Sequence, residues 1–277
     1  MPDSGSTRLP ISELRRYYEA LVGLLKEQEQ TALAEAHADN PTLLAKRFRR
    51  SIEGLDEHFD EHPKIDELFY DSERADPADP DNRATSIGDI KSTLQFAAEL
   101  CDGRSRRVTG GELLAFRYVD REISPLRSKH TRREDRVARR SLDLLLANAC
   151  DNTPIFAELK LRGDRPTYFA LVQLLMLVAE FLPARQRERV AEFQPSAGNL
   201  AWPAAGPFAD AYIVAFEPPA TGKYRQRSFD ATARICEKLI ARPDVSSIIR
   251  RIAYIEATDN GAGGLAFTSK FAFGRGL

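Results

Sequence analysis

Two short apolar runs separated by a turn, and followed by a long apolar run, constrain the fold of this 277-residue chain more than any other feature. The runs SLDLLLAN (141–148) and PIFAELKL (154–161) have the length and composition of buried strands, and ACDN between them is typical of a turn. The run from Tyr168 to Leu182 is too long for a strand. It predicts a buried helix that is opened by Asp164 as N-cap and Pro166 in the first turn.

The two predicted strands carry charges on one face. In a hairpin centred between Cys150 and Asp151, the register puts Asp143 directly opposite Glu158, with Cβ atoms about 5 Å apart. Strand alternation then puts Lys160 on the same face as Glu158. Two carboxylates this close repel each other, and one is driven toward protonation unless a cation lies between them.

A divalent cation with oxygen ligands is the natural partner of this pair. Mg²⁺ takes one or two protein carboxylates and leaves other positions to water and substrate phosphate. We therefore predict a Mg²⁺ or Mn²⁺ site formed by Asp143, Glu158 and the Leu159 carbonyl, with Lys160 assisting the attacking water. These groups suit metal-assisted hydrolysis of a phosphodiester.

Asp143 on one strand, the triplet Glu158-Leu159-Lys160 on the next and Gln173 on the following helix form a recognisable series. Over roughly residues 112–217 the chain resembles the PD-(D/E)XK, or restriction-enzyme-like, nuclease superfamily, although Leu142 stands where the motif's name has proline. The resemblance implies a Mg²⁺- or Mn²⁺-dependent deoxyribonuclease in which Gln173 helps position the metal site.

The same resemblance implies a fold class and a division of the chain. We expect an α/β protein with a mixed central sheet flanked by helices, a restriction-endonuclease-like core, over residues 101–277. A mainly helical region over residues 1–100, with an acidic linker near 71–84, would precede it. The superfamily's frequent extra acidic residue has three candidates here, Glu99, Glu112 and Glu122, of which Glu122 is preferred.

Basic charge is concentrated in one segment although the formal net charge is −1. Residues 101–141 hold 12 basic and 6 acidic side chains, and clustered basic charge favours nucleic-acid binding. The alternative is a solvated, salt-bridged surface. We expect nucleic acid, DNA rather than RNA, as the partner, and the candidate backbone contacts are Arg127, Lys129, Arg132, Arg133 and Arg140.

Three other interpretations stay open at this stage. The charged pair could be a structural ion pair, or the domain a catalytically inactive nucleic-acid-binding or protein-interaction module on the same fold. His58, Glu61 and His62 also match a His-x-x-Glu-His zinc pattern, but Pro63 follows at once and few apolar residues surround it, so a solvated acidic helix end is the favoured explanation.

The remaining expectations concern location and secondary structure. Three widely spaced cysteines and the absence of a secretory signal at the start favour a cytoplasmic protein, with no membrane contact and a homodimer formed through the N-terminal helices as a further expectation. We expect helices over residues 11–36, 41–52, 86–101 and 231–241, strands over 115–123, 212–216 and 248–256, and a terminal hairpin or loose end in the glycine-rich tail 260–277.

Overall fold

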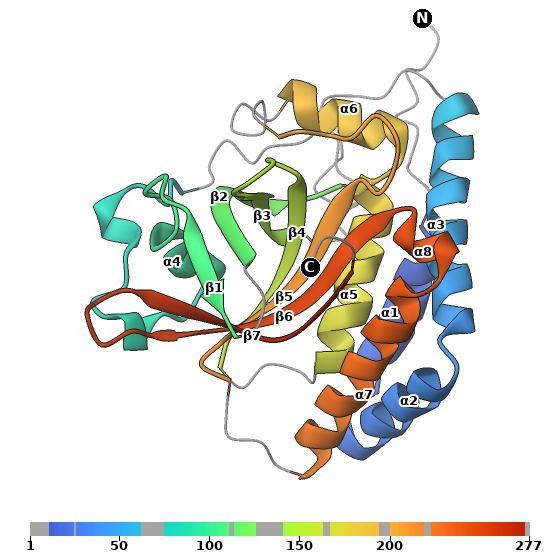
Figure 1. Cartoon of the computed structure of the whole chain (residues 1–277), viewed down its shortest axis with the longest axis horizontal. Coiled ribbons are helices and arrows are strands. Elements are labelled where there is room, and N and C mark those ends of the chain that lie inside the picture. The colour runs from blue at the N-terminus through green and yellow to red at the C-terminus, as the bar shows by residue number, and fades with distance from the viewer. Residues whose placement is uncertain are drawn as a thin grey trace, which may run out of the picture.

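The computed structural model of the chain describes residues 11–24, 26–61, 75–110, 114–125, 141–162, 167–193, 200–218 and 223–274. Helices gather along one side of a twisted sheet, and α4 lies on the other side (Figure 1). The helices are α1 (Glu13–Val22), α2 (Glu27–Asp39), α3 (Thr42–Glu61), α4 (Thr93–Ala98), α5 (Thr167–Phe181), α6 (Ala184–Phe193), α7 (Lys223–Ile240) and α8 (Pro243–Ser246), with 3₁₀ turns η1 (Pro80–Asn82) and η2 (Ile87–Asp89). The strands are β1 (Arg106–Thr109), β2 (Leu114–Ile123), β3 (Leu142–Asn148), β4 (Pro154–Lys160), β5 (Ala209–Phe216), β6 (Ile249–Asp259) and β7 (Leu265–Gly274).

The seven strands form a closed mixed barrel in sequence order, so the predicted open central sheet of a restriction-endonuclease-like core is wrong. Strands β4, β5 and β6 run parallel to one another, whereas β1 to β4 and the pair β6 and β7 are joined antiparallel. The closing contact is parallel and short: Val108 pairs with Phe267, and Thr109 pairs with Thr268.

The closure depends on β1, which the sequence analysis did not identify, and on β7, which lies in the tail where a hairpin or a loose end was expected. β1 lies within the arginine-rich segment that we had interpreted as a phosphate-binding track, and most of the glycine-rich tail is the ten-residue strand β7. Gly110 follows β1 with φ +103°, and a Cβ there would lie 2.5 Å from the Ser269 carbonyl oxygen. Glycine at this position therefore lets the ends of β1 and β7 approach each other.

We expect Gly110→Ala to lower the free energy of unfolding by at least about 2 kcal/mol, because alanine is strained at positive φ and meets backbone that cannot move aside. Gly54→Ala is the matched control, since Gly54 lies within α3 and nothing is within 4 Å of its added Cβ. That variant should be more stable than wild type by about 0.5–1 kcal/mol. Urea unfolding of both variants tests this, and equal stabilities would contradict it.

The strands bury apolar side chains on both faces. On one face Leu145 and Phe156 pack beneath α5, in a cluster that also takes in residues of α1, α2, α3 and α7. On the other face, which the closed sheet turns inward, Leu144 and Ile155 pack with Phe96 of α4. Helix α5 is apolar around nearly its whole circumference because other elements cover every side of it.

The N-terminal helices are part of the first of these clusters rather than a separate core. Arg15 of α1 forms a bidentate pair with Glu180 of α5, with Nε–Oε1 and Nη2–Oε2 distances of 2.7 and 2.5 Å, and both side chains are fully buried. Ser12 caps α1 and also donates to Glu180. These contacts fix α1 along α5.

Several helix boundaries differ from the sequence prediction. The first predicted helix is two helices, because α1 ends at Val22 with Gly23 as its C-cap and α2 begins at Glu27. The helix predicted over residues 86–101 is instead the three-residue 3₁₀ turn η2 followed by the six-residue α4. Helix α7 begins eight residues before the start predicted for it. In the described part of the chain no single helix is long and apolar enough to span a membrane. Helix α5 and residues 184–191 of α6 together have the length and composition of a span, but the two helices are bent by 84° where they meet.

Candidate functional site

The β3–β4 hairpin has the predicted register. Leu144 pairs with Ala157 and Leu145 with Phe156, so Asp143 and Glu158 stand one step beyond the last pair. Their carboxyl groups are close enough for the charge of Glu158 to act on Asp143. The Leu159 backbone N–H donates to Asp143 Oδ2 at 2.9 Å. Two carboxylates this close disfavour each other's ionisation unless a cation lies between them.

Lys160 completes a compact polar group with these carboxylates. Its Nζ donates to Glu158 Oε1 at 2.7 Å and to Gln173 Oε1 at 3.4 Å. Glu158 is 1% exposed and Gln173 is 8% exposed, whereas the Lys160 side chain is 18% exposed. The structure therefore brings together all four residues that the sequence analysis named as catalytic, and solvent reaches the group at Asp143 and Lys160, which are both partly exposed.

Tyr18 of α1 is a member of this group that the sequence analysis missed. Its hydroxyl donates to Gln173 Oε1 at 2.9 Å, and the side chain is 3% exposed. Tyr18 and Lys160 thus share the same acceptor, which holds the Gln173 carboxamide oxygen toward the lysine. Tyr18 falls within the helix predicted over residues 11–36, and nothing in the sequence indicated that this helix would pack on α5.

The electrostatics of the group follow from burial and mutual contact. Burial, followed by the negative charge of Glu158, raises the pKa of Asp143 well above its ordinary value, despite opposing contributions from Lys160 and the Leu159 N–H. Burial by itself lowers the pKa of Lys160, but the charges of Glu158 and Asp143 together outweigh it, and the net pKa is raised. Lys160 is therefore a cation near neutral pH.

The donor set suits a hard divalent cation. Asp143 and Glu158 supply adjacent carboxylate oxygens, and the Leu159 carbonyl lies on the same edge of β4 as the N–H that reaches Asp143. Among the described residues no three His, Cys, Asp or Glu side chains are grouped as a metal site, so the candidate site has two carboxylates and depends on backbone, water and substrate for the rest.

The candidates for an extra acidic residue lie in different places. Glu122 falls between the pairs Arg121–Leu144 and Ile123–Leu142, so its backbone is opposite Asp143, but it has φ +51° and its carboxylate contacts Arg121. Glu99 is at the end of α4 and lines a separate pocket. Glu112 lies outside the described residues.

The proposed backbone contacts Arg127, Lys129, Arg132, Arg133 and Arg140 lie outside the described residues. Of the zinc pattern, His58 and Glu61 are in the last turn of α3, and His62 lies outside the described residues.

Comparison of the chain with protein-family models, with curated proteins and with solved structures found no significant match. The functional argument therefore depends on the chain's own residues and their geometry.

Proposed function

We propose that this protein is a metal-dependent nuclease that hydrolyses phosphodiester bonds, with DNA as its substrate. The observation that carries the proposal is the adjacent carboxyl pair Asp143 and Glu158, held by the Leu159 N–H and by the Lys160 ammonium group. A buried pair of carboxyl groups is unfavourable by itself, and it becomes favourable when both ionise around a divalent cation. A group with perturbed pKa values that meets solvent is typical of a functional site.

Each residue has a distinct role in this proposal. Asp143, Glu158 and the Leu159 carbonyl would hold Mg²⁺ or Mn²⁺. When bound, the cation supplies Lewis-acid stabilisation of charge on the phosphodiester. Lys160, being protonated, orients the attacking water and stabilises negative charge on the phosphate through its N–H groups, rather than acting as a base.

Gln173 and Tyr18 act as positioning residues. The Gln173 carboxamide oxygen accepts from both Lys160 and Tyr18, so it keeps the ammonium group aimed at the position between the carboxylates and solvent. The Arg15–Glu180 pair fixes α1 along α5 and so fixes Tyr18. The N-terminal helices are in this way part of the proposed catalytic unit.

The basic segment is joined to the sheet next to the site. Ile123, at the end of β2, pairs with Leu142, the neighbour of Asp143. Residues 126–140 connect these two strand ends in sequence, so the chain that carries the predicted phosphate contacts leaves and re-enters the sheet beside Asp143. This connectivity supports nucleic acid as the substrate.

We expect the double variant Arg132→Gln, Arg133→Gln to bind duplex DNA of any sequence more weakly and to a similar extent. Each lost phosphate contact should flatten the slope of log affinity against log salt by about 0.9. Fluorescence anisotropy across a salt series measures both quantities. A variant with unchanged affinity and slope would show that these arginines do not contact the backbone.

The direct test of the proposal is nicking of supercoiled plasmid with Mn²⁺, with Mg²⁺ and with chelator. Cleavage that requires the metal and is lost in Glu158→Gln supports a nuclease. A panel of single-stranded, duplex, branched and RNA oligonucleotides then identifies the substrate. Absence of cleavage on every member of the panel with either metal would contradict the proposal.

The alternative is a non-catalytic nucleic-acid-binding or protein-interaction module. The observation that favours it is the burial of Glu158 and Gln173, the latter against Tyr18 of α1, which leaves Lys160 as the most accessible of the three. In that case duplex DNA would bind without being cut, and metal would not change the melting temperature.

A further inference from the structure

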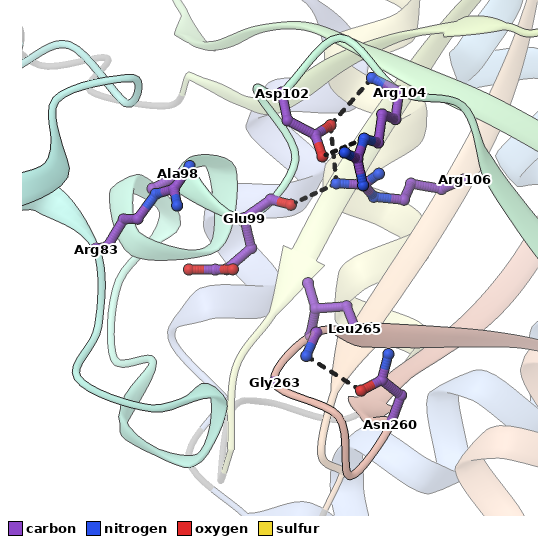
Figure 2. Close-up of a pocket in the computed structure, with 10 residues that line it drawn as sticks. Arg83, Ala98, Glu99, Asp102, Arg104, Arg106, Asn260, Gly263 and Leu265 are labelled. Carbon is purple, nitrogen blue, oxygen red and sulfur yellow. Dashed lines mark hydrogen bonds and ion pairs between the residues drawn. The ribbon is translucent and has the colours of Figure 1, made fainter.

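A pocket of about 300 Å³ lies away from the candidate nuclease site, and its lining shares no residue with it. It is formed by the end of α4, the segment leading into β1 and the hairpin between β6 and β7 (Figure 2). Its volume is at the lower end of the range for small-molecule sites. Asp102, Arg104 and Arg106 group on one side of it, and Asn260 and Gly263 lie on the hairpin side.

One wall of the pocket holds a fixed cation. Arg106 Nη2 donates to the Glu99 carbonyl oxygen at 2.7 Å and contacts Asp102 Oδ1 at 3.0 Å. Arg104 also pairs with Asp102, at 3.7 Å, so two guanidinium groups share one carboxylate and keep an excess positive charge. Asp102 in turn accepts from the Arg104 backbone N–H, which orders the turn. Arg106 is thus held in place for an anion, and Arg104, whose side chain is 81% exposed, adds a second positive charge beside it.

Further groups lining the pocket are free to bind a ligand. Within the described part of the chain, neither the Arg83 guanidinium nor the Glu99 carboxylate makes a hydrogen bond or ion pair. The Asn260 side-chain oxygen accepts from the Ala262 and Gly264 N–H groups, which turns its amide nitrogen outward as a donor. The pocket therefore presents cations, one free carboxylate and one amide donor, with Ala98 and Leu265 as apolar wall.

This combination fits a ligand that has an anionic group and a separate hydrogen-bond donor edge. An inorganic anion would repel the Glu99 carboxylate and offer it no hydrogen-bond donor. A purely cationic ligand would be repelled by the arginines. We propose that the pocket binds a mononucleotide, with its phosphate on Arg83, Arg104 and Arg106 and the donor edge of its base on Glu99. Guanine is the preferred base, because its N1–H and N2–H₂ groups match a carboxylate in two parallel hydrogen bonds.

Isothermal titration calorimetry with dGMP, dTMP, deoxyguanosine and inorganic phosphate, in chelator, tests the proposal. We expect dGMP to bind more tightly than dTMP, and each half-ligand to bind at least about tenfold more weakly than dGMP. Arg83→Gln should weaken dGMP about tenfold, the loss expected for one charge-assisted hydrogen bond. Glu99→Gln should reduce the preference for dGMP over dTMP.

Two controls separate this site from the proposed nuclease site. Arg107→Gln removes an exposed arginine of β1 next to Arg106 that does not line the pocket, and it should bind dGMP like wild type. Lys160→Ala should also bind dGMP unchanged, since no residue is shared, so the nucleotide result does not depend on the nuclease activity. No binding of any mononucleotide at millimolar concentration, or equal binding by Arg83→Gln and Arg107→Gln, would overturn the proposal.

Discussion

Replacing Lys160 by alanine is expected to reduce DNA cleavage by at least about 10²–10³-fold, the effect of removing one donor that stabilises charge in a transition state. Lys160 is the one cation described in contact with both Glu158 and Gln173, and its raised pKa keeps it protonated. Metal binding should be kept, because the carboxylates remain and a competing positive charge is removed. Single-turnover cleavage with Mn²⁺, together with Mn²⁺ titration by calorimetry, measures the two effects.

The matched control for this variant is Lys270→Ala. Lys270 of β7 also forms an ion pair with a strand glutamate, Glu256 at 2.9 Å, but it is 43% exposed and belongs to a different part of the barrel. A surface pair of this kind contributes little to stability. Cleavage by Lys270→Ala should therefore equal wild type. If Lys160→Ala cleaves as fast as Lys270→Ala, Lys160 has no catalytic role.

The local part of the candidate site could be predicted because it depends on strand register alone. Asp143, Glu158 and Lys160 lie on two strands joined by a short turn, so period-two alternation and the turn position determine which side chains meet. Gln173 was named from the resemblance to the nuclease superfamily and not from strand geometry. The candidate site's link to α1 could not be predicted, because Tyr18 is 155 residues from Gln173 and no pattern within α1 specifies its partner helix.

The closure of the sheet could not be predicted either, because it also depends on contacts between residues far apart in the sequence. β1 has four residues and an arginine-rich sequence, so it carries no apolar alternation to mark it as a strand. β7 follows a glycine-rich turn that masks a ten-residue strand. Their contact is made by two residue pairs between opposite ends of the chain's sheet region, and it depends on the small size of Gly110. Long-range pairing of this kind leaves almost no local signal.

Asp143→Asn is expected to leave the metal-free protein at least as stable as wild type at neutral pH. The raised pKa of Asp143 means that the folded state binds a proton more tightly than the unfolded state. Stability from this group is therefore present at low pH and is lost as pH rises from the ordinary aspartate pKa through the raised one. Asparagine keeps the shape and does not ionise, so the variant should lose that dependence on pH.

The same variant should lose its response to metal. Binding to the folded state alone stabilises the wild type by RT ln(1 + [L]/Kd), about 2.7 kcal/mol at 100 times Kd. A structural ion pair predicts the reverse, because loss of Asp143 would leave the partly buried Lys160 with one opposite charge fewer and cost up to about 3–5 kcal/mol with or without metal. Thermal melts of wild type and Asp143→Asn, in chelator and across a Mn²⁺ series at two pH values, distinguish the two. A large fall in melting temperature for Asp143→Asn in chelator, with a wild type that does not respond to Mn²⁺, would mean that Asp143 and Glu158 are structural and that the metal site does not exist.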